Sequence, residues 1–345
     1  MNTNLINNEV NWKELLLAIL SLLPVLVGFM LFHEPMLFNV GLVTISLFIP
    51  CARIKSGIFI VVLQFVLIWF CFSVLFFALN KPYLFVLFCA LLAFSTIYVT
   101  RYGSNLRTIA NFIFIPAVYL ACELRESLHG AALIPSYIKF ISLLPIALLS
   151  VILLLLAKNI LTVNKKSKNL SMKSDIQTFT SKVFHPKIRG EEKLNWLKEG
   201  LAIFFGVMLA ATFVAYMHIA HGEWVIWSTA AVITGDMLSA KKKTQDRLIG
   251  LIFGIPLGFF LAQFLPKTTV VYSLAALGVM LTLIAFKKYR VAFGGRCFFI
   301  AVASYVATST PQIALERVEN VILGGIIGMA SLYICHQLMG RFGRR

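Results

Sequence analysis

The chain has 345 residues, of which 59% are hydrophobic and 13% are charged, and its mean hydropathy is +0.88. A soluble chain of this length would carry about twice that charged fraction, so a large soluble domain is excluded. The formal net charge of +17 does not indicate nucleic acid, because basic residues collect in the cytoplasmic loops of membrane proteins. The composition therefore predicts an all-α polytopic membrane protein surrounded by membrane lipids.

Runs of apolar residues recur along the chain, and most are close to the length of about 20 that crosses a bilayer core as a helix. Six runs in the first part of the chain and six in the second predict twelve membrane spans. The spans are expected at 13–32, 36–51, 56–79, 83–100, 106–124 and 134–157, and at 196–217, 223–239, 247–265, 269–286, 294–310 and 315–338.

A polar, lysine-rich stretch at 159–195 separates the two sets of spans. It is expected to be a cytoplasmic linker near anionic lipid headgroups, between a first six-helix half, 1–158, and a second, 196–345. The halves are weakly alike, since "NWKELLLAIL" at 11–20 is similar to "NWLKEGLAIFF" at 195–205. With six spans in each half, the two copies would be parallel repeats.

The distribution of basic residues predicts the orientation of the chain. With the N-terminus inside, twelve spans leave 5 of the 31 lysines and arginines outside. The positive-inside rule favours this arrangement, which places both termini and the linker in the cytoplasm. A cleavable signal peptide is not expected, because the first apolar run is too long and lacks a small-residue cleavage site.

Two stretches of the second half share one pattern, in which an acid and an arginine precede small residues at every fourth position. The residues are Asp246, Arg247, Gly250, Gly254 and Gly258 in the first copy, and Glu316, Arg317, Asn320, Gly324 and Gly328 in the second. Residues four apart share a helix face, so the glycines predict flat strips for close helix packing in lipid. On the twelve-span threading the copies run in opposite directions, as an inverted three-plus-three repeat within each half would produce.

Each arginine of the pattern is expected at the N-terminal end of its span. There the helix dipole adds positive potential and favours an anion. The adjoining Asp246 or Glu316 would neutralise the arginine locally, and an incoming organic anion would compete with that acid. Snorkelling of Arg247 and Arg317 to the membrane interface is the alternative that the sequence leaves open.

Further candidates for a transport site are polar or aromatic residues in or near the spans. Asp236, Glu319 and Asn320 are costly to place in a bilayer and are more often functional than not. Glu319 is the first candidate for a proton-coupling carboxylate, with a purely structural hydrogen bond as the alternative. Trp224 and Trp227 are either interfacial anchors or the wall of an aromatic substrate site.

The sequence contains no catalytic signature. A phosphate-binding GxxxxGK[ST] loop is absent, and neither a Ser/His/Asp order nor a zinc-ligand spacing occurs. The six cysteines are scattered through apolar segments, so free thiols and no metal site are expected. We therefore expect neither an enzyme nor a cofactor.

The segment 223–262, "EWVIWSTAAVITGDMLSAKKKTQDRLIGLIFGIPLGFFLA", resembles the signature region of the fusaric-acid-resistance-like (FUSC) and aromatic-acid-exporter membrane proteins. In that family a tryptophan-containing span precedes a basic loop and an arginine–glycine ladder. The matching residues here are Trp227, Lys243, Arg247, Gly250, Gly254 and Gly258. The resemblance is good over about 195–340 and weak over 12–160. The family often has a proline where this chain has Gly235-Asp236, and its cytoplasmic domains are larger than this linker and tail.

The resemblance implies proton-driven efflux of amphipathic organic anions, such as aromatic carboxylates, across a bacterial inner membrane. Small organic anions would be the partners, and a homo-oligomer and a periplasmic membrane-fusion partner stay open. The family also has a distant likeness to plant malate channels, so an organic-anion channel is one alternative. A non-transport membrane scaffold, in which the glycines only pack helices, is another.

Overall fold

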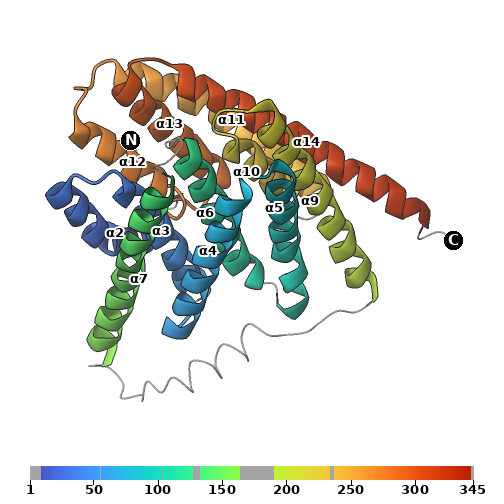
Figure 1. Cartoon of the computed structure of the whole chain (residues 1–345), viewed down its shortest axis with the longest axis horizontal. Coiled ribbons are helices and arrows are strands. Elements are labelled where there is room, and N and C mark those ends of the chain that lie inside the picture. Colours follow the sequence, from blue (N-terminus) through green and yellow to red (C-terminus); the bar gives the residue numbers. More distant parts are fainter. Residues whose placement is uncertain are drawn as a thin grey trace. The chain divides into compact units, whose positions relative to one another are not determined.

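The computed structural model describes residues 9–54, 56–103, 105–126, 133–163, 190–233 and 237–342, and the regular elements in these ranges are helices (Figure 1). They are α2 (Trp12–Phe32), α3 (Met36–Ile54), α4 (Ile58–Ala78), α5 (Pro82–Tyr98), the 3-10 helix η1 (Val99–Tyr102), α6 (Leu106–Glu126), α7 (Leu133–Val163), α9 (Gly190–Met217), α10 (Glu223–Val232), α11 (Met237–Ala262), α12 (Thr269–Leu281), α13 (Tyr289–Thr308) and α14 (Gln312–Phe342).

The sequence predicted twelve membrane spans, whereas ten of the described helices are long and apolar enough to cross a bilayer. The helices occur in the predicted order, but α10 has 10 residues and α12 has 13, and a span needs about 20. β-Branched residues and Gly235 follow Val232, and their low helix propensity is ignored when apolar runs are counted. The chain is thus a multi-pass membrane protein in which the twelve-span arrangement of two repeats is not confirmed.

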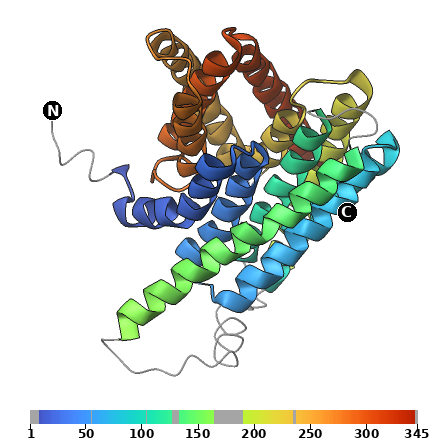
Figure 2. The same ribbon diagram turned by 60° about the vertical axis from the view of Figure 1, so that its left-hand side comes forward.

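One compact unit comprises Ile19–Phe204 and consists mainly of α3 to α7. α4 packs against α5 and α6, and α7 lies beside both α3 and α4 (Figure 2). The buried amide of Gln64 on α4 donates to the carbonyls of Ser46 on α3 and Phe112 on α6, at 3.0 and 3.3 Å. One polar side chain therefore ties three helices together inside an apolar core.

The other compact unit comprises Met1–Ala18 and Phe205–Arg345. The boundaries between the units fall inside α2 and α9. Most of the predicted linker 159–195 lies outside the described residues, and at its two ends α7 and α9 are helical to Val163 and from Gly190.

The N-terminal segment of this unit is bound to the connection between α12 and α13. Val10 forms an antiparallel bridge with Phe286, and the N–H of Asn11 donates to the carbonyl of Ala285 at 2.8 Å. These backbone contacts join residues 10 and 11 to residues 285 and 286, which are far from them in the sequence.

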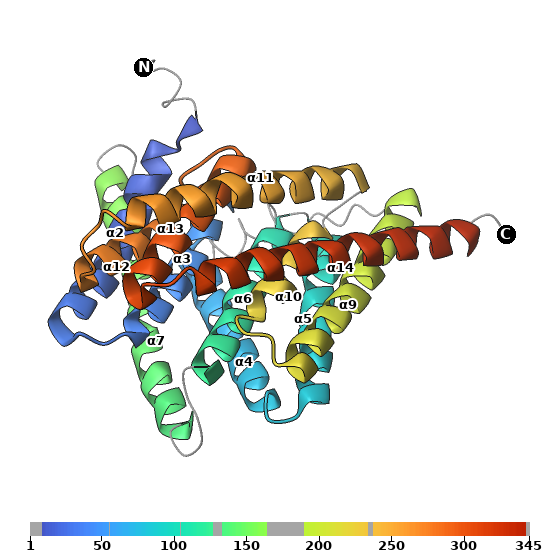
Figure 3. The same ribbon diagram turned by 90° about the horizontal axis from the view of Figure 1, so that it is seen from above.

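Two helix pairs, α11 with α13 and α10 with α14, make the closest contacts within this second unit (Figure 3). α11 also touches α10 and α14, and α12 packs against α13. The two acid–arginine–glycine stretches lie on α11 and α14, one in each pair, so the pairs bring them into the same region.

Candidate functional site

Two buried arginines converge on the ring of Phe293 on α13. Arg247 of α11 and Arg317 of α14 are 6% and 3% exposed. Their guanidinium carbons lie 4.6 and 6.0 Å from the centroid of the Phe293 ring. A snorkelling arginine would extend to the surface, whereas both of these side chains turn toward the interior of the unit.

The position of Arg247 corrects one expectation from the sequence. α11 begins at Met237, so Arg247 lies about 15 Å along the helix at a rise of 1.5 Å per residue. The helix dipole acts within the first turn and does not favour an anion at Arg247. Lysine and glutamine are good helix formers, so the charged residues that were read as a loop extend the helix instead.

The glycines of α11 allow α13 to approach closely. A Cβ atom added at Gly250, Gly254 or Gly258 would come within 2.8 Å of α13 or overlap with it. At Gly254 the overlap would be with the carbonyl oxygen of Gly294. The short distance between these helices is what allows Arg247 to lie over a ring of α13.

The glycines of α14 do the same against α10. A Cβ at Gly324 would overlap the carbonyl oxygen of Val225, and one at Gly328 would lie 3.0 Å from the carbonyl oxygen of Thr229. Here too the close approach places an arginine on a ring, because the guanidinium carbon of Arg317 lies 4.6 Å from the centroid of Trp224. The same distance separates Arg247 from Phe293.

The acid before each arginine pairs with a residue of the neighbouring helix. Asp246 accepts a hydrogen bond from Nε of Arg290 on α13 at 2.8 Å. Glu316 lies 3.8 Å from Nε2 of His221, just before α10. The expectation that these acids neutralise the adjoining arginines is therefore wrong, because each acid is directed to another partner.

Each arginine also reaches from its own helix pair to the other pair. Arg247 donates to the hydroxyl of Ser228 on α10 at 2.7 Å and to the hydroxyl of Tyr289 on α13 at 3.2 Å. Arg317 lies within electrostatic range of the thiol of Cys297 on α13. Ser228 and Cys297 occupy corresponding positions, as Trp224 and Phe293 do, so one set of contacts occurs twice with different side chains.

The two arginines lack a direct carboxylate partner among the residues that the structure describes, although Glu223 lies within electrostatic range of Arg317. No carboxylate in these ranges forms an ion pair with either guanidinium, and Nε of each lacks a hydrogen-bond partner there. Asp236, a predicted site residue, lies outside the described residues. A buried cation without a counter-ion is costly, so this arrangement favours an incoming anion.

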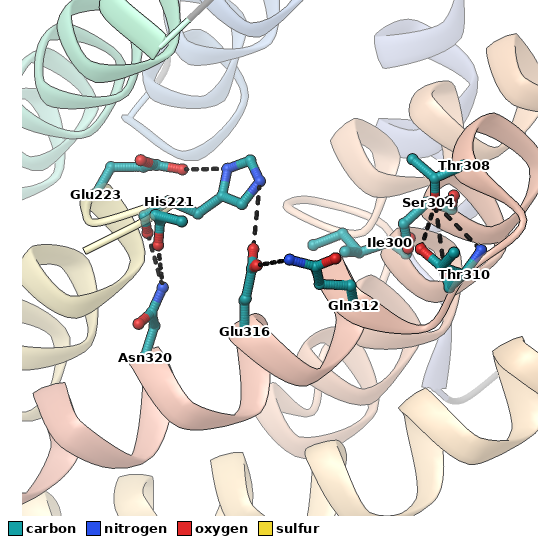
Figure 4. Close-up of polar contacts among 10 residues, drawn as sticks. His221, Glu223, Ile300, Ser304, Thr308, Thr310, Gln312, Glu316 and Asn320 are labelled. Atoms are coloured by element: carbon teal, nitrogen blue, oxygen red, sulfur yellow. Dashed lines mark hydrogen bonds and ion pairs between the residues drawn. The ribbon is translucent and has the colours of Figure 1, made fainter. Parts of the chain in front are cut away.

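His221 lies between the start of α10 and the first residues of α14 (Figure 4). The imidazole lies between two carboxylates, with Nδ1 3.7 Å from Glu223 and Nε2 3.8 Å from Glu316. It stacks on Trp224 at 4.5 Å between ring centroids.

The other predicted residues differ in their surroundings. Asn320 is buried and donates to the backbone carbonyls of Ala220 and His221, so it holds the turn before α10. Glu319 is exposed on α14, and Trp227 is half-buried on α10.

Sequence reasoning missed three residues of the site. Glu223 is completely buried, and neither of its carboxylate oxygens accepts a hydrogen bond from a described residue. Its place beside Trp224 at the start of an apolar run was a usable signal. Phe293 gave none among 30 phenylalanines. Arg296 on α13 lies within electrostatic range of both arginines, and it was not among the predicted site residues.

A cavity of about 270 Å³ adjoins Arg247, between α11 and α14. Its walls are mainly apolar side chains of these helices and of Val232. Arg247 is the one charged residue among the described residues that line it.

Residues 209–331 match the model of the family described as fusaric acid resistance protein-like. This match confirms, for this region, the resemblance that the sequence indicated. It includes both arginines, the glycines of both ladders and the aromatic residues on which the arginines stack. No curated protein and no solved structure gave a match to the chain.

Proposed function

We propose, on the premise that residues 209–331 form a fusaric acid resistance protein-like domain, that this protein exports small amphipathic organic acids. In this proposal it is a secondary transporter of a bacterial inner membrane with both termini in the cytoplasm. The observation that carries the proposal is the meeting of Arg247 and Arg317 at Phe293 without a carboxylate partner among the described residues.

The chemistry of these residues favours an aromatic or otherwise apolar carboxylate. Arginine binds carboxylates through charge-assisted hydrogen bonds, and Nε of each guanidinium still has a hydrogen to donate to an anion. The rings of Phe293 and Trp224 add apolar surface beside the cations, which suits the body of such a ligand. An inorganic anion would use the charge but not the rings.

The proposal includes proton coupling, and we assign the proton-carrying carboxylate to Glu223 rather than to Glu319. Glu319 is exposed on α14. Glu223 is completely buried, lies 3.7 Å from Nδ1 of His221 and interacts electrostatically with Arg317. A carboxylate in such a place changes the charge beside the anion site when it takes up a proton.

The direct test is efflux of labelled benzoate from proteoliposomes with and without a pH gradient. Arg247→Gln should lower the rate by about tenfold or more, since a hydrogen bond to a charged group contributes about 1.5–3 kcal/mol. Arg317→Gln should lower it by a smaller factor, because Arg317 acts on the anion at longer range. Lys267→Gln is the matched control, because Lys267 is exposed and its ammonium contacts, among the described residues, Ser309 and the ring of Tyr305. Stable arginine variants with unchanged flux would overturn the proposal and favour the scaffold.

The same preparation separates a carrier from a channel. Ohmic single-channel currents carried by benzoate would replace the carrier with an organic-anion channel at the same arginines. Efflux that ignores the pH gradient would remove the proton coupling alone. Glu223→Gln should abolish the effect of the gradient, and Glu319→Gln should retain it.

A further inference from the structure

The cavity beside Arg247 exists because one glycine of α14 does not serve helix packing. Gly324 and Gly328 face α10, where a Cβ would be crowded. At the intervening Gly325, the nearest atom to an added Cβ is Cγ2 of Thr244, at 3.9 Å. Glycine weakens a helix relative to alanine, so Gly325 lowers helix propensity without allowing a closer contact, and the result is open space.

The corresponding place in the other helix pair is filled. Ile255 of α11 takes the position that Gly325 has on α14, and Ala314 takes that of Thr244. Ile255 and Ala314 both belong to a closely packed apolar cluster that includes Phe293. The cavity therefore arises because these two positions differ between the helix pairs, and not because the helices are loosely packed in general.

The cavity opens on the lateral surface of the helices. Leu248, Ile322 and Ile326 line it and are 37%, 39% and 62% exposed. The lining residues of α14, Val321 to Met329, lie at the middle of the candidate span Gln312–Met339. A lateral opening at mid-span faces the hydrocarbon of a bilayer. A molecule dissolved in the membrane would therefore reach Arg247 without passing through water.

We propose that this cavity is a lateral binding port for a small lipophilic monocarboxylate, with its carboxylate on Arg247 and its apolar body along α14. This inference rests on the proposed function, because the port would supply the anion site at Arg247 and Arg317 from the membrane. Its volume of about 270 Å³ is below the roughly 300–1,000 Å³ of pockets for drug-sized ligands. It therefore suits one aromatic ring or a short chain. Arg247 is the one charged residue among the described residues that line the cavity, so an acid, unlike a lipid tail, would bring a charge that pairs with its guanidinium.

The test is photolabelling of the full chain in lipid nanodiscs with a benzoic acid that carries a trifluoromethyl-diazirine in the para position. Peptide mapping should place adducts on 244–248 of α11 and 321–329 of α14. Gly325→Ile introduces the side chain of the matched position and should reduce labelling by about tenfold or more, because it overfills the space. Gly325→Ala is the matched control and should retain most of the labelling, since its Cβ meets nothing closer than 3.9 Å.

A second arm uses only wild-type protein and does not depend on the folding of a variant. The corresponding benzamide has the same ring and diazirine but no charge, and it should label these peptides about tenfold less, since it lacks the charge-assisted hydrogen bond. Equal labelling by acid and amide would mean that the cavity only receives apolar groups, which overturns the proposal. Adducts confined to other helices, or none at all, would overturn it as well.

The labelling and the efflux assay can fail independently. Labelling that Gly325→Ile removes, in a protein without benzoate efflux, would support the port and contradict the transport proposal. Efflux that depends on Arg317 but is unchanged in Gly325→Ile would support transport and reject the port.

Discussion

The α11–α13 pair and the α14–α10 pair make the same contacts with different side chains. In the first pair the acid Asp246 is held by the guanidinium of Arg290 at 2.8 Å. In the second, Glu316 faces the imidazole of His221 at 3.8 Å. A guanidinium keeps its charge at any physiological pH, whereas an imidazole changes charge near neutrality. The α11–α13 pair thus contains a permanent ion pair, whereas the contact in the α14–α10 pair depends on the protonation of an imidazole.

The two helix pairs also differ in the space next to each arginine. Arg317 has the packed cluster of Ile255 near it, and Arg247 has the cavity left by Gly325. The repeated glycines bring both arginines to one ring, and the unrepeated residues decide which arginine a ligand can reach. The contacts that the two pairs share therefore determine where the arginines lie, and the residues that differ determine which arginine is accessible.

The largest expected effect concerns the two arginines. Arg247→Gln should weaken equilibrium binding of labelled benzoate in nanodiscs by about 10- to 100-fold, because a charge-assisted hydrogen bond contributes about 1.5–3 kcal/mol. Arg317→Gln should weaken it less than about fivefold, since Arg317 does not line the cavity and acts at longer range. Equal losses of binding in a scintillation proximity assay would show that the ligand reaches both arginines equally well.

Two neighbouring glycines give the next effect, on stability. Gly324→Ala forces a Cβ onto the carbonyl oxygen of Val225 and should cost about 1–3 kcal/mol, as overpacking does. Gly325→Ala places its Cβ in open space and should be neutral or stabilise by up to about 1 kcal/mol. Thermal unfolding followed by fluorescence-detected size exclusion measures both. A similar loss for the two variants would contradict the division of these glycines into packing and cavity residues.

Substitution of the two acids tests whether Asp246 is bound more strongly by Arg290 than Glu316 is by His221. Asp246→Asn removes a charge-assisted hydrogen bond at 2.8 Å, although Arg290 is half-exposed, so we expect a loss of about 1 kcal/mol. Glu316→Gln should cost only a few tenths of a kcal/mol at neutral pH, because its contact with His221 is 3.8 Å long. Melting temperatures of the two variants, measured side by side, check the order. A larger effect at Glu316 would reverse this account of the two pairs.

The smallest effect comes from exchanging the residues that the arginines reach across the pairs. Ser228→Cys should cost about 1 kcal/mol, because the hydroxyl accepts from Arg247 at 2.7 Å and a thiol is a weaker acceptor. Cys297→Ser should be neutral or slightly stabilising, since Arg317 would gain a hydroxyl acceptor. Thermal unfolding again provides the measurement. A destabilising Cys297→Ser would show that the two positions are not interchangeable.

The repeated motif could be predicted from the sequence because it consists of rare residues at fixed spacing. Asp246, Arg247 and their counterparts stand out in an apolar chain, and glycines four apart define a helix face without further information. The order of the helices followed from apolar runs in the same way. Where the arginine side chains end could not be predicted, because spacing along one helix does not tell which helix packs against it.

The residues that spacing could not reveal are those defined by their neighbours. Phe293 is one apolar residue among many, and only the approach of α11 to α13 gives it two arginines. Gly325 stands directly after a packing glycine, so the sequence offers no reason to treat the two differently. The start of α11 was misplaced because charge was taken to end a helix, although lysine favours one.

The antiparallel contact of Val10 with Phe286 matters for anyone who cuts or tags this chain. A fragment that begins at residue 196 would contain every arginine discussed above. It would lack the N-terminal residues that pair with the α12–α13 connection. Purification tags should therefore leave residues 9–11 free to pair.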